Sequence, residues 1–211
     1  VASLSLRLAE HQMNCQFTRE FANVSIPALP LGRSGNIVHG NACRIDWNEV
    51  CPHTKEEEVF VMGNPPYLGA RLQDEGQKTD MECVFNNIRG YNNLDYIASW
   101  FYKGSQYIKE SKGRIAFVST NSICQGEQVS LLWPYILKDS EIYFAYSWFK
   151  WSNNAKHNAG VTCTVIGLTA KDNIKGRWLY TEKNKNQVDF INAYLSTGSS
   201  VIVMPQSSSL Q

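Results

Sequence analysis

The sequence predicts an α/β fold with a mainly parallel sheet and an antiparallel hairpin at one edge. Short apolar runs alternate with longer segments of helical periodicity, an order typical of α/β domains. The hairpin is expected because two late strands, 141–149 and 161–168, follow each other too closely for a helical crossover.

The first half of the chain contains one clear helix and two candidate strands. Residues 4–22 begin with apolar side chains at three- and four-residue spacing, which predicts a helix. The β-branched run 36–39 and the apolar run 59–62 are expected to be strands, and the second stops at Gly63. The polar segment 68–92 has no clear period, so we expect a long loop with local helix.

The second half alternates more regularly. A helix is expected from residue 94 to about 112, where a Lys-Gly pair is typical of a helix C-terminus. A strand at 115–118 and a helix at 127–137 precede the hairpin. Beyond the hairpin, residues 174–204 are expected to hold a weak strand, a helix near 187–195 and a final apolar run.

Composition limits the class of protein. Apolar residues make up 43% and aromatic residues 12% of 211 residues, which is typical of a folded chain of one large or two small domains. The net charge of +1 excludes a uniformly basic coat for nucleic acid. No apolar run is long enough to cross a bilayer, and the first eight residues lack the features of a secretory signal. A cytoplasmic protein is therefore expected.

The six cysteines are scattered, without a CxxC pair. This pattern is typical of reduced thiols rather than of a disulfide framework. Cys43, Cys51 and His53 lie close in sequence, but a structural zinc site normally needs a fourth ligand. We therefore expect no metal.

The chemistry is expected at Asn64-Pro65-Pro66-Tyr67, directly after a predicted strand. Sites of open α/β sheets lie at the carboxyl ends of strands. Proline fixes φ and has no N–H, so the preceding carbonyls remain without a local partner. The side-chain carbonyl of Asn64 and the backbone carbonyl of Pro65 then offer acceptors to an NH2 group, and Tyr67 offers a face for stacking. The structural alternative is a turn with a packing tyrosine.

This set of groups fits a planar ring with an exocyclic amine, adenine or less readily cytosine. Acceptors on the amino protons draw the nitrogen lone pair out of conjugation with the ring. The amine then becomes able to attack an activated methyl group. A base inside a duplex would first have to rotate out of the stack.

These four residues resemble the NPPY motif of amino-group DNA methyltransferases, specifically adenine-N6 enzymes with the gamma-type motif order. The resemblance covers essentially residues 1–205 and is greatest to the methyltransferase portion of large bifunctional restriction-modification enzymes. Further segments resemble other family motifs: 37–47 the cofactor-adenine segment, 93–96 and 115–123 the two following motifs, and 149–161 the late motif of the target-base pocket.

The resemblance implies a class I, Rossmann-like fold and S-adenosylmethionine as cofactor. The glycine-rich FxGxG loop of the family is absent, which implies a fragment without the first strands and with impaired cofactor binding. Residues 1–170 are expected to form a partial catalytic domain, and 171–211 an extension toward a DNA-recognition domain.

The resemblance also assigns roles to residues. Asn64, Pro65, Pro66 and Tyr67 would be catalytic, with Asn41 and Ala42 at the cofactor, Phe149 and Trp151 in the target-base pocket, and Lys150, Lys156 and His157 on DNA. Each group has a structural alternative: a turn at Asn41, core packing of Phe149 and a solvated hairpin tip at 150–160.

The expected function is methyl transfer to the N6 amine of a flipped adenine in DNA, within a bacterial restriction-modification system. The expected partners are double-stranded DNA and the other domains of a parent chain, a recognition domain and a nuclease, with no membrane. Two alternatives remain open. One is a methyltransferase that acts on an RNA amine or a protein glutamine, and the other is a non-catalytic fragment or interaction module.

Overall fold

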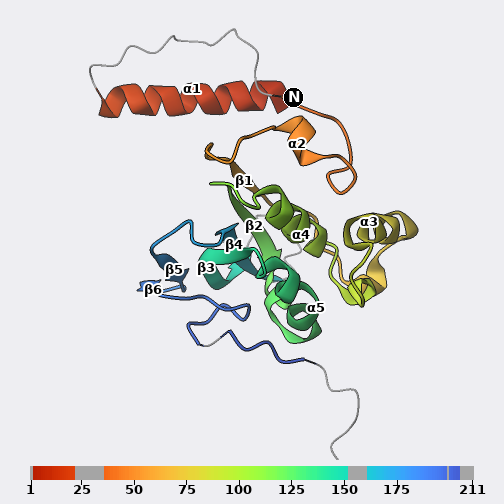
Figure 1. Ribbon diagram of the computed structural model, residues 1–211. Coiled ribbons are helices and arrows are strands. Elements are labelled where there is room, and N and C mark those ends of the chain that lie inside the picture. The colour runs from red at the N-terminus through yellow and green to blue at the C-terminus, as the bar shows by residue number, and fades with distance from the viewer. Residues whose placement is uncertain (1, 22–35, 152–160, 199, 205–211) are drawn as a thin grey trace, which may run out of the picture.

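The computed structural model describes residues 2–21, 36–151, 161–198 and 200–204 (Figure 1). Six strands form one sheet in the order β1-β2-β4-β3-β5-β6. The strands are β1 (Phe60–Gly63), β2 (Arg114–Thr120), β3 (Ser140–Trp151), β4 (Val161–Ala170), β5 (Arg177–Tyr180) and β6 (Lys185–Val188). The helices are α1 (Ala2–Glu20), α2 (Trp47–Val50), α3 (Glu75–Phe85), α4 (Ala98–Tyr107) and α5 (Gly126–Ile136), with 3₁₀ turns η1 (Ala70–Leu72), η2 (Tyr91–Asn93) and η3 (Asn121–Cys124).

The sheet is mixed, so the prediction of a mainly parallel sheet is wrong. β1 pairs with β2 and β3 with β5 in parallel, whereas the pairs β2–β4, β3–β4 and β5–β6 are antiparallel. The predicted hairpin of β3 and β4 is confirmed, but it lies inside the sheet and not at its edge. The reason is that β5, expected only as a weak strand, adds to the outer side of β3. β5 and β6 thus extend the sheet beyond residue 170.

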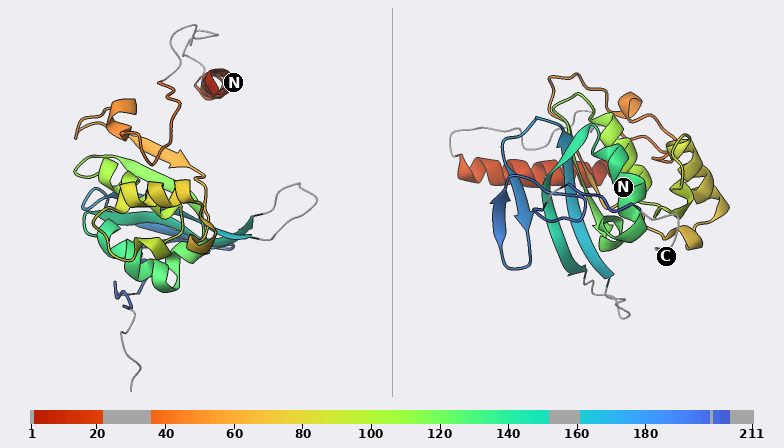
Figure 2. Two further views of the ribbon diagram at one scale, coloured as in Figure 1. Left: turned by 90° about the vertical axis from the view of Figure 1, so that its right-hand side faces the viewer. Right: turned by 60° about the horizontal axis from the view of Figure 1, so that its bottom comes forward.

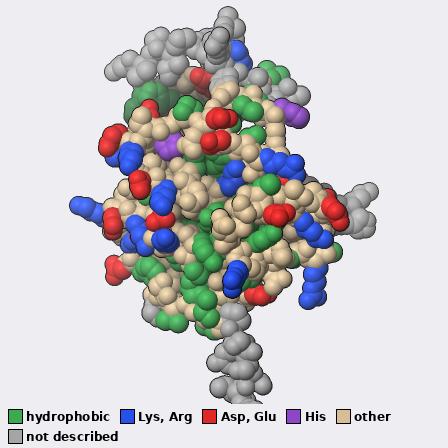
Figure 3. All heavy atoms as spheres, turned by 45° about the vertical axis from the view of Figure 1, so that its right-hand side comes forward, with side chains coloured by type: hydrophobic (Ala, Val, Ile, Leu, Met, Phe, Trp, Pro, Cys, Tyr) green, Lys and Arg blue, Asp and Glu red, His purple; other side chains and the backbone are tan. Residues whose placement is uncertain are grey.

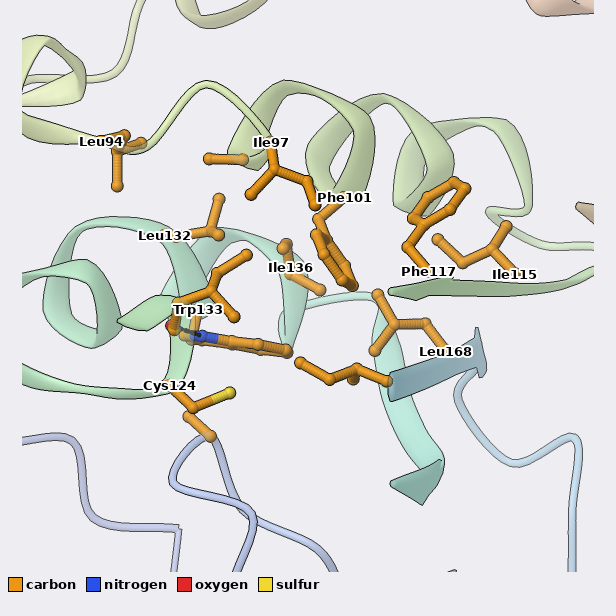
Figure 4. Packing of buried hydrophobic residues seen from close by; sticks show 14 of the residues in the cluster. Leu94, Ile97, Phe101, Ile115, Phe117, Cys124, Leu132, Trp133, Ile136 and Leu168 are labelled. Atoms are coloured by element: carbon orange, nitrogen blue, oxygen red, sulfur yellow. Dashed lines mark hydrogen bonds between the residues drawn. The ribbon is translucent and has the colours of Figure 1, made fainter. Parts of the chain in front are cut away.

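Helices α3, α4 and α5 lie on one side of the sheet (Figures 1 and 2). The core lies between α4, α5 and the strands (Figure 4). There Phe101 of α4 meets Phe117 of β2 edge to face, with ring centroids 5.4 Å apart. Trp133 of α5 is fully buried, and its indole N–H donates to the carbonyl of Ile123 at 2.8 Å, so its polar atom is satisfied.

The segment 68–92, expected as a loop with local helix, contains the full helix α3. Its start is a capping box: Asp74 Oδ1 accepts from the backbone N–H of Gln77 at 2.8 Å, and Gln77 Oε1 accepts from that of Asp74 at 3.1 Å. The pattern Asp-x-x-Gln was the available sequence signal, because such a pair satisfies N–H groups that a helix start leaves free.

Two predicted elements are not formed. Residues 36–39 carry no strand, and Ile37 and Val38 are exposed, so this β-branched run has no described neighbour to pair with. Residues 187–195 are not a helix: β6 ends at Val188, and Asn192 Oδ1 accepts from the backbone N–H groups of Tyr194 and Ser196. Such local side-chain bonds compete with the helical ladder.

The other predicted helices and strands are present within a few residues of their expected bounds. Helix α1 lies apart from the sheet, beyond β1 (Figures 1 and 2). No helix in the described part of the chain is long and apolar enough to span a membrane. The directions of the strands bring the carboxyl ends of β1, β2 and β3 to the same edge of the sheet, which is where the predicted site should lie.

Candidate active site

The four-residue motif leaves the carboxyl end of β1, whose last residue, Gly63, pairs with Phe117 of β2. Asn64 and Pro66 are exposed, Tyr67 is half-buried and Pro65 is buried. Within the described residues, neither the Asn64 side chain nor the Pro65 carbonyl has a hydrogen-bond partner. The exposed Asn64 side chain is therefore available to a ligand, and the Pro65 carbonyl keeps an unused capacity to accept a hydrogen bond.

A hollow of about 330 Å³ lies beside the motif. Asn64 supplies a polar group to it, and two tryptophans, Trp47 and Trp100, supply aromatic walls. The indole N–H of Trp47 donates to the carbonyl of Ala42 at 2.9 Å, which fixes this ring. A flat ring with polar edges suits such walls. The remaining lining residues are Val61, Met62, Gly63, Pro65 and Phe117.

The predicted cofactor residues Asn41 and Ala42 are not among the residues that line this hollow. Asn41 Oδ1 accepts from the backbone N–H of Cys43 at 2.9 Å, and its Nδ2 donates to Asp80 at 2.8 Å. Asn41 thus shapes a turn, and Ala42 reaches the hollow only through Trp47. A contact of either residue with the cofactor stays a prediction.

Asp80 of α3 organises this turn. Its carboxylate is 2% exposed and accepts from Asn41, from Arg44 Nε at 2.5 Å and from the Tyr96 hydroxyl at 2.7 Å. Burial alone would raise the pKa of Asp80, but these hydrogen bonds and the charge of Arg44 outweigh it and hold the pKa below its ordinary value. Asp80 therefore joins α3 to the turn and to the segment that precedes α4.

Leu68, the residue after the motif, is held by the segment 94–96. Its N–H donates to Asp95 Oδ1 at 2.9 Å, and its carbonyl accepts from the backbone N–H of Tyr96 at 3.0 Å. The buried amide of Gln73 donates to the carbonyls of Leu68 and Leu94. Burial raises the pKa of Asp95, and the N–H groups of Ile97 and Leu68 offset part of this rise.

The predicted target-base residue Phe149 is half-buried in β3, opposite Cys163 of β4, which in turn faces Thr120 at the end of β2. Phe149 therefore lies at the same edge of the sheet as the motif, three strand spacings or about 14 Å from β1. Lys150 is exposed at this edge.

The other late residues are described only in part. Trp151 ends β3, but its side chain is outside what the structure describes. Lys156 and His157 lie outside the described residues.

Sequence reasoning missed three residues near the motif. Trp47 and Trp100 line the hollow, and Gln73 donates to the carbonyl of Leu68, yet none of the three was assigned a role there from the sequence. A signal existed for Trp47, which belongs to the segment that resembles the cofactor motif. None existed for Trp100 or Gln73, because their role depends on contacts between distant segments.

Comparison with known proteins identifies the family. Residues 1–181 match the family model described as MmeI, DNA-methyltransferase domain. The chain belongs to this family. The expected resemblance to the methyltransferase portion of a restriction-modification enzyme is thereby confirmed.

Two relatives of this chain are much longer than the segment that it matches in them. DNA methyltransferase A of Bacillus subtilis (strain 168) is 45% identical over 204 residues, which are 96% of this chain and 23% of that protein. The Type IIL restriction-modification enzyme MmeI, solved in complex with DNA, superposes with a TM-score of 0.82 at 37% identity, over 97% of this chain and 28% of that one. The chain thus spans about a quarter of the length of these relatives.

Proposed function

We propose that this chain supplies the target-amine side of a site that transfers a methyl group from S-adenosylmethionine to the N6 amine of a flipped adenine in double-stranded DNA. The observation that carries the proposal is the pair of unengaged acceptors, Asn64 Oδ1 and the Pro65 carbonyl, at the carboxyl end of β1 beside an aromatic hollow. Membership of a family described as a DNA-methyltransferase domain supports it.

The residues of the motif act on the amine. Asn64 and the Pro65 carbonyl accept hydrogen bonds from its two N–H groups and draw the nitrogen lone pair out of conjugation. The proline rings keep these acceptors fixed, because φ is locked at both positions. No strong base is required before attack, since the nitrogen becomes acidic as it is alkylated. The hydrogen bonds strengthen as that acidity develops, so they favour the transition state.

Aromatic side chains hold the base outside the duplex. Tyr67 offers a face directly after the two acceptors, and Phe149 offers a second aromatic ring on β3 at the same edge of the sheet. Stacking of the base on Tyr67 would offset the unstacking that flipping requires. Trp151 would add to this pocket, and Lys150, Lys156 and His157 would bind phosphate.

We assign this hollow to the flat ring of the cofactor, because aromatic side chains line it. Trp47 and Trp100 would flank the adenine ring, with Asn41 and Ala42 nearby. S-adenosylmethionine, when bound, supplies the activated methyl group. The sequence has no FxGxG segment to hold the methionine part, so these residues alone form a partial cofactor site.

The arrangement supports a class I, Rossmann-like architecture. In the described structure β1 pairs only with β2, and its Phe60 and Met62 side chains are 55% and 77% exposed. Further strands of a class I sheet would adjoin this outer edge. We propose that the partial catalytic domain, expected at 1–170, also includes β5 and β6, which belong to the same sheet. The extension toward a recognition domain, expected at 171–211, would then begin after β6, in a bacterial cytoplasmic restriction-modification enzyme.

The test is methyl transfer by the full-length gene product and its Asn64→Ala variant, with labelled S-adenosylmethionine and duplex DNA, RNA or a glutamine peptide as acceptor. We expect activity on duplex DNA and a loss of kcat of about 100- to 1,000-fold in the variant, the range for one donor or acceptor aimed at developing charge. Undiminished kcat would exclude the assigned role, and transfer to RNA or peptide alone would favour the alternative substrates.

A further inference from the structure

The motif is fixed at two points that lie just outside it. On one side Gly63 belongs to the parallel pair of β1 and β2. On the other side the Leu68 peptide is bonded through both its N–H and its carbonyl, to Asp95, Tyr96 and Gln73. The span between them, residues 64–67, contains two prolines that have no N–H to donate. The position of the acceptors therefore depends on these two anchors.

Asp95 is the centre of the second anchor. Its side chain is 8% exposed, and one oxygen, Oδ1, accepts from the N–H of Leu68 at 2.9 Å and from that of Ile97 at 3.2 Å. Its own N–H donates to Gln128 Oε1 of α5 at 2.9 Å. Gln128 in turn donates to the carbonyl of Asn93 at 2.7 Å. The carboxylate is thus held by the N–H groups of Leu68 and Ile97, and the Asp95 backbone is held by α5.

The anchor continues into the core. Leu94 and Ile97, on either side of Asp95, are fully buried and point toward Leu132 of α5 (Figure 4). A well-packed core resists displacement, since interiors are as dense as organic crystals. The segment 94–97 therefore carries the rigidity of the core to the motif.

We propose that Asp95 is a positioning residue for methyl transfer: its carboxylate holds the Leu68 peptide and so sets the Asn64 and Pro65 acceptors. This rests on the proposed function. Asp95 itself touches neither the base nor the cofactor. What it supplies is an acceptor oxygen, so an amide oxygen at the same place would serve.

The experiment compares Asp95→Ala and Asp95→Asn in the full-length gene product. Single-turnover methyl transfer, DNA affinity, cofactor affinity and Tm are measured for each. We expect Asp95→Ala to slow transfer about 10- to 100-fold, since a misplacement of about 1 Å can cost on the order of 100-fold. Affinities should change little, and Asp95→Asn should restore the rate to within about threefold because its Oδ1 still accepts from Leu68.

Glu141→Ala is the matched control for lost stability. Glu141 pairs with Arg177, is largely buried and is the second residue of β3, opposite Thr169, at the end of the sheet away from the motif. Removing one partner of such a pair destabilises the fold. The control should lower Tm yet leave the rate of transfer unchanged.

Amide hydrogen exchange gives a readout that does not depend on activity. In the Asp95→Ala variant, amide hydrogens of the peptide containing Leu68 should exchange at least tenfold faster than in the wild type. In the Glu141→Ala variant their exchange rate should not change. The proposal is overturned if exchange at Leu68 is unchanged, if Asp95→Asn is as slow as Asp95→Ala, or if Glu141→Ala slows transfer equally. An inactive wild-type protein would instead contradict the proposed function, while exchange would still show whether Asp95 holds Leu68.

Discussion

We propose different tasks for Asn64, Pro65 and Tyr67, although these residues are adjacent. Asn64 is exposed and Pro65 is buried, so the side-chain acceptor faces outward while the ring beside it fixes the backbone. Tyr67 is half-buried, which leaves one part of its ring for packing and another for a ligand. This division follows from the strand that ends at Gly63 and from the bonds of Leu68.

The stacking role of Tyr67 predicts a difference between two substitutions. Tyr67→Phe keeps the aromatic face and should retain kcat/KM for duplex DNA within about threefold. Tyr67→Ala should lose about 10- to 100-fold, because stacking of a base on an aromatic side chain contributes roughly 1–3 kcal/mol. Steady-state methylation kinetics would decide, and equal losses in both variants would instead assign the function to the hydroxyl.

At the residue scale the sequence predicts the motif of the candidate site but not the residues that hold this motif in place. Residues 64–67 could be singled out because four adjacent residues contain the acceptors, the prolines and the aromatic ring that the proposed chemistry needs. The tie between Leu68 and Asp95 spans 27 positions of sequence and was not recognisable, since nothing local records which distant carboxylate meets a free N–H. The same holds for Trp100, which reaches the motif only through the packing of α4.

At the scale of elements, α3 and the segment before α4 form a frame around the motif. Asp80 joins α3 to the turn at Asn41 and to Tyr96, and Gln73 joins the start of α3 to Leu68 and Leu94. The segment 68–92 thus returns the chain to the sheet edge and supplies buried polar groups there.

The frame predicts a pH-dependent effect of Asp80→Asn on stability. The pKa of Asp80 lies below its ordinary value in the folded chain, so its stabilising effect is present above about pH 4, the unfolded pKa, and is lost as pH falls through the folded pKa. At pH 7 the free energy of unfolding of the variant should be about 1.5–3 kcal/mol lower than that of the wild type, which is the range for hydrogen bonds to a charged group.

Urea denaturation from pH 7 to pH 3 measures this difference. The difference in free energy of unfolding between the wild type and Asp80→Asn should become smaller only below about pH 4. Asp139→Asn is the control, because its carboxylate is partly exposed and pairs with Lys109 at 3.0 Å at the surface, where such pairs contribute about 0–1 kcal/mol. A gap for Asp80→Asn that is independent of pH would contradict the assignment.

Which elements could be predicted depended on whether the pattern was self-contained. β2 and α5 follow from their own apolar periodicity, and the β3–β4 hairpin from its short connection. The mixed sheet did not follow, because β5 and β6 are short and polar at their ends and gain their neighbours only through β3. Helix α3 has few apolar residues, and its capping box was the better signal.

At the scale of the whole molecule, the net charge of the chain and the share of its relatives' length that it spans lead to one inference about DNA binding. Basic and acidic side chains are interspersed on the face shown in Figure 3, consistent with a net charge of +1. The chain spans about a quarter of its relatives. We infer that other parts of the parent protein bind most of the DNA phosphates, and that this chain contributes the pocket for the base.

The missing FxGxG segment predicts weak cofactor binding by the 211-residue chain. Isothermal titration with S-adenosylmethionine should show a Kd at least 100-fold weaker than that of the full-length gene product. Tight binding by the chain alone would contradict the partial cofactor site. Absence of binding and of methyl transfer in the full-length product would favour the non-catalytic alternative.

The chemical identity of the methylated product tests the proposed transfer to the N6 amine of adenine most directly. Unmethylated duplex DNA is incubated with the full-length gene product and labelled S-adenosylmethionine, then digested to nucleosides and separated by mass. We predict label in N6-methyladenine, present with the wild type and lost with Asn64→Ala. Label in a methylated cytosine, or N6-methyladenine formed equally well by Asn64→Ala, would contradict this prediction.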